Sequence, residues 1–258
     1  MKNLIAVGSG KGGVGKSTIS LHLALALKEQ GAAVGLIDAD IYGPSQPVML
    51  GTQHEKPIIK DKKIKPYQKA GIQSISIGNL VERSTAMAWR GPMLGKALEQ
   101  LIRDTEWEDL DYLIVDLPPG TGDVQLTLCQ KMPLVGAVLV TTPQELALSD
   151  VRRAAEMFLK LNVPLLGIIE NMSWYQCPHC KHEDALFGES GGRKLAEEQA
   201  TAFLGEVPFI KQLREHADIG KAESDLVHFG DMALKLAERI ASLPKDYSAK
   251  FPKIVVKN

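Results

Sequence analysis

The chain has 258 residues, of which 45% are hydrophobic and 24% charged, and its formal net charge at pH 7 is -1. This length and composition allow one large α/β domain with a buried core, and we expect residues 1–258 to form that single domain. The near-neutral charge gives no reason to expect nucleic acid or an anionic membrane as a partner. The apolar run at residues 1–8 is too short for a signal peptide or a membrane anchor, so a cytoplasmic protein is expected.

Apolar runs of strand length alternate with segments of helical period along the chain. The predicted strands are 4–7, 33–37, 72–77, 112–115, 135–140, 165–169 and 202–204. The predicted helices are 17–29, 93–103, 147–161, 191–199 and 231–243. This alternation predicts an α/β fold with a mainly parallel central sheet and helices on both faces. Ligand-binding loops are then expected at the carboxyl ends of the strands.

A glycine-rich segment, G-K-G-G-V-G-K-S at residues 10–17, lies between the first predicted strand and the first predicted helix. It fits the phosphate-loop pattern G-x-x-x-x-G-K-[ST], whose amides turn inward around phosphate oxygens. Lys16 is expected to reach the β- and γ-phosphates of ATP and to act in catalysis, while Ser17 offers its hydroxyl to Mg²⁺. The predicted nucleotide-binding residues here are Gly10, Gly12, Gly13, Val14, Gly15, Lys16, Ser17 and Thr18.

Three carboxylates follow predicted strands. Asp38 and Asp40 end the segment L-I-D-A-D, and Asp116 follows Y-L-I-V in the manner of a Walker B aspartate. Asp38 and Asp116 are predicted to hold Mg²⁺, although Asp38 and Asp40 are also compatible with solvated aspartates at the start of a loop. The loop at residues 117–123 contains two glycines and is interpreted as a switch that senses the γ-phosphate.

Lys11 is a second lysine inside the phosphate loop, where an ordinary phosphate loop needs no charge. With it, K-G-G-V-G-K-S resembles the deviant Walker A loop of the MinD, ParA and nitrogenase iron protein ATPases. The resemblance implies that Lys11 acts in trans across a nucleotide-sandwich homodimer and that Asp40 orients the attacking water. It also implies that Asp38 contacts magnesium-bound solvent and that Asn171 recognises the base, although a plain turn asparagine is an alternative for Asn171.

Two cysteines, Cys177 and Cys180, are separated by two residues, so that both thiolates can bind one metal ion or cluster. A second chain would complete a four-thiolate set for a bridging 4Fe-4S iron–sulfur cluster. The alternatives are a zinc site completed by His179 or His182, a redox dithiol, or two structural thiols. The third cysteine, Cys129, is predicted to be a buried helical thiol.

The combined motifs resemble Mrp or ApbC type iron–sulfur cluster carrier ATPases. The matching segments are D-A-D-I-Y-G-P-S, D-L-P-P-G-T-G-D, and N-M-S followed by C-P-H-C and F-G. The resemblance implies a slow ATPase that forms a homodimer, holds a labile cluster between subunits and passes it to acceptor apoproteins. Many relatives carry an additional N-terminal domain, and any function of that domain is not expected here.

Three other functions compete with a cluster carrier. A MinD- or ParA-like positioning or partition ATPase would use a basic amphipathic end or a basic face, but the tail at residues 245–258 shows no such helix. The lysine-rich stretch at residues 56–69 is interpreted as a solvated loop or an edge hairpin. A reductase component would shield its cluster on rigid elements. A nucleotide switch without turnover would use the same phosphate-site residues.

Overall fold

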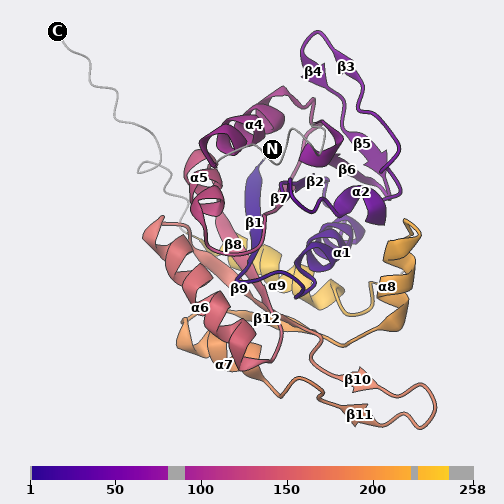
Figure 1. Cartoon of the computed structure of the whole chain (residues 1–258), viewed down its shortest axis with the longest axis vertical. Coiled ribbons are helices and arrows are strands. Elements are labelled where there is room, and N and C mark those ends of the chain that lie inside the picture. The colour runs from indigo at the N-terminus through magenta and orange to yellow at the C-terminus, as the bar shows by residue number, and fades with distance from the viewer. Residues whose placement is uncertain (1, 81–90, 222–225, 244–258) are drawn as a thin grey trace, which may run out of the picture.

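A twisted eight-stranded sheet forms the centre of the protein in a computed structural model that describes residues 2–80, 91–221 and 226–243 (Figure 1). The strand order is β12-β9-β8-β1-β7-β2-β6-β5, and every neighbouring pair is parallel except β5 with β6. The strands of this sheet are β1 (Asn3–Ser9), β2 (Val34–Asp38), β5 (Tyr67–Lys69), β6 (Ile72–Ser76), β7 (Tyr112–Asp116), β8 (Gly136–Thr141), β9 (Leu165–Asn171) and β12 (Phe203–Val207). The expected mainly parallel sheet is therefore confirmed.

Helices cover both faces of the sheet (Figure 1). One face carries α1 (Lys16–Glu29), α2 (Gln46–Met49), α8 (Lys211–Asp218) and α9 (Gly230–Ala241). The other carries α4 (Gly91–Asp104), α5 (Asp123–Lys131), α6 (Glu145–Lys160) and α7 (Gly191–Glu198). Side chains of β1 alternate between the two cores, with Leu4 and Ala6 on one side and Ile5 and Val7 on the other. Burial on both faces explains why these strands are apolar throughout.

Two small antiparallel hairpins lie outside the main sheet. The first joins β3 (Ile59–Lys60) to β4 (Lys63–Ile64) through Asp61 and Lys62, both at positive φ. The lysine-rich stretch at residues 56–69 therefore contains this separate hairpin and the strand β5 at the edge of the main sheet. The second hairpin joins β10 (Tyr175–Gln176) to β11 (Glu183–Asp184) and contains both Cys177 and Cys180.

The predicted strands and helices are all present, with ends that differ by a few residues. The predicted ranges do not include the helices α2, α5 and α8 or the short strands β10 and β11. In α2 and α8 the apolar positions are too few to give a clear helical stripe. The tail at residues 245–258 lies outside the described residues. Within the described ranges, the helices are all too short or too polar to cross a bilayer.

The strand register brings the predicted carboxylates together. Asp38 at the end of β2 is the pairing partner of Asp116 at the end of β7, and Asp116 in turn pairs with Val7 in β1. Because β1 leads into the glycine-rich loop, this loop, Asp38 and Asp116 all lie at the carboxyl ends of neighbouring parallel strands.

Candidate functional site

The glycine-rich loop curls around a pocket of about 290 Å³ before α1 begins at Lys16. Gly13 and Gly15 have φ of 82° and 80°, a backbone region that other residues rarely adopt. Gly15 is also confined, because a side chain there would collide with the Nδ2 atom of Asn171. Lys11 is half-buried in the wall of the same pocket. The loop thus has the open, amide-lined form that binds phosphate groups at a helix N-terminus.

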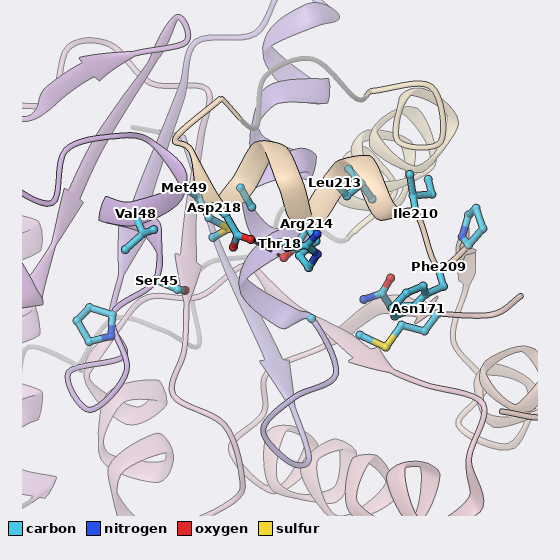
Figure 2. A pocket seen from close by; sticks show the side chains of 15 residues that line it. Thr18, Ser45, Val48, Met49, Asn171, Phe209, Ile210, Leu213, Arg214 and Asp218 are labelled. Carbon is cyan, nitrogen blue, oxygen red and sulfur yellow. Dashed lines mark hydrogen bonds and ion pairs between the residues drawn. The ribbon is translucent and has the colours of Figure 1, made fainter. Parts of the chain in front are cut away.

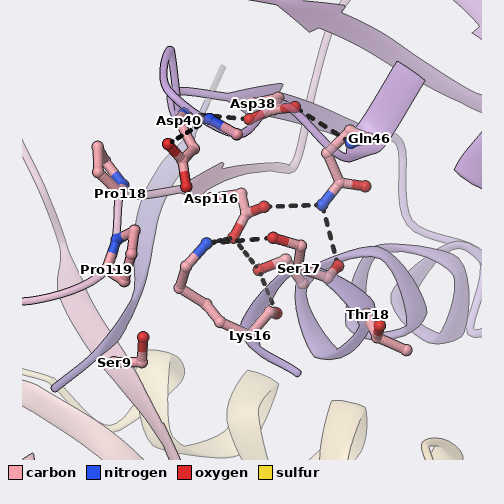
Figure 3. Close-up of polar contacts among 12 residues, drawn as sticks. Ser9, Lys16, Ser17, Thr18, Asp38, Asp40, Gln46, Asp116, Pro118 and Pro119 are labelled. Carbon is pink, nitrogen blue, oxygen red and sulfur yellow. Dashed lines mark hydrogen bonds and ion pairs between the residues drawn. The ribbon is translucent and has the colours of Figure 1, made fainter. Parts of the chain in front are cut away.

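Asp116 is the centre of the polar network beneath this loop (Figure 3). Its Oδ1 atom lies 2.5 Å from Lys16 Nζ and accepts a hydrogen bond of 2.9 Å from Ser20 Oγ. Its Oδ2 atom accepts a hydrogen bond of 2.9 Å from Gln46 Nε2, which also donates to the carbonyl of Ser17. The carboxylate is completely buried, and each of its oxygens therefore has a protein partner.

Asp38 lies beside Asp116 and is also completely buried. It accepts backbone N–H bonds from Asp40 and Gln46, both at 3.1 Å. Burial, together with the adjacent Asp116 carboxylate, raises the pKa of Asp38 to about 8. Two carboxylates this close favour a cation between them, because a positive charge relieves both the desolvation and their mutual repulsion.

Asp40 occupies the rim of the phosphate pocket, and its Oδ1 atom accepts N–H bonds from Tyr42 and Gly43. Burial raises its pKa as well. On its other side lies a second pocket of about 500 Å³, formed with the loop at residues 118–125. That loop is tied to the end of β1, directly before the phosphate loop, since the N–H of Gly120 donates to the carbonyl of Ser9 at 3.0 Å.

The residues at this edge match the chemistry of a magnesium nucleotide. One hydroxyl, from Ser17, and two carboxylates, from Asp38 and Asp116, are hard oxygen donors of the kind that Mg²⁺ prefers. The structure brings these three side chains and Lys16 together and places Asp40 at the rim. Gln46 was missed by sequence reasoning: its side chain is buried and its Oε1 atom has no hydrogen-bond partner within the described protein.

An apolar pocket of about 500 Å³ adjoins the phosphate pocket at Gly15 and Thr18 (Figure 2). Val48 and Met49 from α2 form one side, and Asn171 and Phe209 lie on the opposite side. Its size and its apolar walls fit a purine ring. Asn171 donates one N–H of its amide to the carbonyl of Val14 at 2.9 Å, which leaves its second N–H and its Oδ1 atom for a ligand.

The cysteine pair lies in the connection between β10 and β11. Cys180 is exposed and Cys177 half-buried, and both thiols are free. The backbone amides of Cys180 and His179 lower the pKa of the Cys177 thiol. In the described part of the chain, no three or more His, Cys, Asp or Glu side chains form a group that could hold a metal ion.

Cys129 lies in α5, outside the cysteine hairpin. It is buried in α5, and burial raises the pKa of its thiol to about 12. The prediction of a buried helical thiol is confirmed.

The mainly parallel sheet, the glycine-rich loop with its early lysine, and the strand-end carboxylates define a P-loop NTPase of the deviant Walker A class. Residues 1–241 match the ParA family, described as NUBPL iron-transfer P-loop NTPases, and the chain belongs to this family.

Curated relatives agree with this assignment. The chain is 53% identical over 223 residues to an iron–sulfur cluster carrier protein of Pseudomonas fragi, covering 86% of this chain and 78% of that protein. It is 50% identical over 249 residues to the iron–sulfur cluster carrier protein of Escherichia coli K12, and the match covers 94% of this chain and 67% of that protein. Its identity to the mouse iron–sulfur cluster transfer protein NUBPL is 48% over 223 residues, and the match covers 86% of this chain and 70% of that protein.

Solved structures show the same fold. A nucleotide-binding protein of Archaeoglobus fulgidus in complex with ADP superposes with a TM-score of 0.76 at 38% identity, covering 86% of this chain and 88% of that one. The cell division ATPase MinD of Pyrococcus furiosus superposes with a TM-score of 0.69 at 20% identity, covering 95% and 100%. The likeness to MinD concerns the fold alone.

Proposed function

We propose that this chain is an ATP-hydrolysing carrier that assembles an iron–sulfur cluster between two copies of itself and transfers it to acceptor apoproteins. The observation that carries the proposal is the accessible Cys177–Cys180 pair on a hairpin that follows β9, the strand whose last residue, Asn171, contacts the phosphate loop. The cysteine hairpin and the nucleotide site thus both adjoin the end of β9. The names of the relatives support the same function.

Ligand number favours a cluster shared by two chains. A 4Fe-4S cluster takes four thiolates, whereas each chain has three cysteines, of which Cys129 is buried. Cys177 and Cys180 therefore supply two ligands, and a twofold-related copy supplies the other two. A solvent-accessible position suits a cluster that must leave. Free thiols that bind a cluster also suit a reducing compartment, and we expect the protein to act in the cytoplasm.

The nucleotide half of the proposal uses the residues at the sheet edge. Lys16 exchanges its contact with Asp116 for the β- and γ-phosphates of ATP, and Ser17, Asp38 and Asp116 hold the Mg²⁺ that accompanies them. The Mg²⁺ supplies charge neutralisation at the phosphates when bound. As Lys16 leaves, the hydrogen bonds from Ser20 and Gln46 keep the Asp116 carboxylate oriented.

The rim residues complete the proposed reaction. Asp40 faces the phosphate pocket and orients the attacking water. Lys11 stabilises the phosphates bound by the partner chain, as an arginine finger does elsewhere. Asn171 takes part in base binding from the wall of the apolar pocket. All of these groups belong to one domain in this proposal.

Anaerobic reconstitution with iron and sulfide tests the proposal. We expect about four irons and four sulfides per dimer, with each single substitution Cys177→Ala and Cys180→Ala reducing the yield to background. Cys129→Ala is the matched control, because it also removes a thiol but leaves the hairpin intact. Transfer is then measured as the activity gained by an apoenzyme that needs a 4Fe-4S cluster. An ATPase that binds zinc alone, or no metal, would instead support a partition-type nucleotide switch.

A further inference from the structure

We propose that Phe209 is a positioning residue that couples occupancy of the apolar pocket by a nucleotide base to the position of the cysteine hairpin. This inference rests on the proposed function for the cargo of the thiols and for the binding of a base in the apolar pocket. Its physical content is that a ligand at one site changes the environment of two thiols at another.

Phe209 belongs to both sites at once. Its side chain lies in the wall of the apolar pocket and is 45% exposed, so that part of the ring faces the space that a base would fill (Figure 2). The ring also meets that of Tyr175 edge to face, with the ring centroids 6.5 Å apart and the planes at 69°. Such a pair has a preferred geometry, and a displacement of one ring therefore displaces the other.

Backbone hydrogen bonds reinforce the contact between the rings. The N–H of Phe209 donates to the carbonyl of Trp174 at 2.7 Å. The N–H and the hydroxyl of Ser173 both donate to the carbonyl of Val207 at 3.1 Å. The end of β12 is thereby joined to the segment that leads directly into the cysteine hairpin.

The hairpin itself has few constraints of its own. Its two strands pair with each other and with no other described strand. The N–H of Cys177 donates to the carbonyl of His182, and the carbonyl of Cys177 accepts from the N–H of Lys181, both at 2.9 Å. A two-stranded hairpin is only marginally stable alone, so the contacts made by the residues where the hairpin begins set its orientation. Tyr175 is the first residue of β10 and lies two positions before Cys177.

Met172 connects the apolar pocket to the residues that lead into the cysteine hairpin. It lines the pocket and has φ of 55°, a left-handed conformation that a non-glycine residue adopts only when its neighbours hold it there. Those neighbours are Asn171, bonded to the phosphate loop, and Ser173, bonded to Val207. A base that presses on Met172 or Phe209 thus acts on both ends of a short, strained connection.

The test measures alkylation of Cys177 and Cys180 in the full-length, cluster-free protein under anaerobic conditions, with and without saturating ADP. Mass spectrometry reports each thiol separately, and buried Cys129 serves as the internal reference. ADP is used because it lacks the γ-phosphate of ATP and fills the base pocket without the full nucleotide of the proposed dimer. Size-exclusion chromatography under the same conditions verifies that ADP leaves the oligomeric state unchanged. We expect saturating ADP to change the alkylation rate of one or both thiols about fivefold or more.

Variants separate coupling from base binding. Phe209→Ala is expected to remove the effect of saturating ADP on the thiols, and Phe209→Tyr to retain it. Tyr175→Ala should also remove the effect and change the affinity for ADP by no more than the coupling itself, because Tyr175 does not line the pocket. Val48→Ala is the matched control: it trims the opposite wall and weakens ADP binding, yet it keeps the full effect at saturation.

Two results would overturn the inference. One is an alkylation rate in the wild-type protein that ADP does not alter, and the other is a Phe209→Ala variant with the full wild-type effect. Neither result concerns iron, so a failure here is distinguishable from a failure of the cluster-carrier proposal, which the reconstitution experiment decides.

Discussion

Lys16 Nζ lies 2.5 Å from Asp116 Oδ1, so that the lysine of the phosphate loop forms an ion pair with the aspartate at the end of β7. Both side chains are almost wholly buried. Removing one member of such a pair leaves the other charge without compensation, which is costly in a region of low dielectric constant. This contact keeps the lysine inside the site, where it lines the phosphate pocket.

The first prediction concerns Lys16→Met, which keeps the aliphatic stem but removes the charge. We expect the free energy of unfolding to fall by about 3 kcal/mol because Asp116 loses its counter-charge. We also expect the affinity for ATP to fall by about 100-fold or more, since the phosphates lose their charged donor. Urea denaturation and calorimetric titration measure the two effects. Lys28→Met, at an exposed ion pair, is the control and should change neither quantity appreciably.

The second prediction concerns Gln46, which links α2 to the magnesium carboxylates. Gln46→Met preserves its volume but removes the hydrogen bonds to Asp116 and Ser17. We expect a loss of about 2 kcal/mol in stability and a rise of about tenfold in the Mg²⁺ concentration needed for half-maximal ATP turnover. Gln46→Glu should be worse on both counts, because it adds a negative charge beside Asp116. An unchanged Mg²⁺ dependence in both variants would show that Gln46 has no part in the site.

The contrast between Gln46 and Lys16 shows what could be predicted from the sequence. Lys16 and Ser17 belong to a local pattern whose geometry follows from glycine conformation and a helix N-terminus. Asp38 and Asp116 could be placed together because parallel strands present their carboxyl ends at one edge. Gln46 has no such signal, since its contacts depend on how a four-residue helix packs against α1 and β7.

The apolar pocket was beyond sequence reasoning for a related reason. Its walls come from α2, from the end of β9 and the residue after it, and from the segment after β12 together with α8, which are three regions far apart in the chain. Neither α2 nor α8 has the length or the apolar stripe that predicts a helix. Asn171 could be selected by resemblance, but the use of its amide on Val14 could not. The contact of Phe209 with Tyr175 likewise depends on tertiary packing.

The third prediction is a pH dependence set by Asp38. Its pKa is raised from 3.8 to about 8, so between these values the folded protein binds a proton that the unfolded chain has released. The free energy of unfolding should therefore fall as pH rises from about 4 to about 8 and then become level with respect to this group. Urea denaturation of the nucleotide-free protein in EDTA at several pH values measures the slope.

Asp38→Asn isolates this contribution, because the amide does not ionise. The variant should lose that part of the slope and be more stable than the wild type at pH 8, by up to several kcal/mol, while the two converge near pH 4. Asp109→Asn, at an exposed position, is the control and should follow the wild-type curve. If the variant and the wild type show the same slope, Asp38 is ionised in the folded protein across this range.

The fourth prediction distinguishes a lysine that acts in trans from one that acts within its own chain. Lys11→Ala and Asp40→Ala should each bind ATP but hydrolyse it slowly. In a mixed dimer, the site on the Lys11→Ala chain retains its own Asp40 and receives Lys11 from the other chain. Random mixing of equal amounts should therefore restore about one quarter of the wild-type rate, because half of the dimers are mixed and each has one complete site. If Lys11 acts in cis, each chain in the mixed dimer lacks one essential group at its own site, and the mixture stays as slow as the single variants.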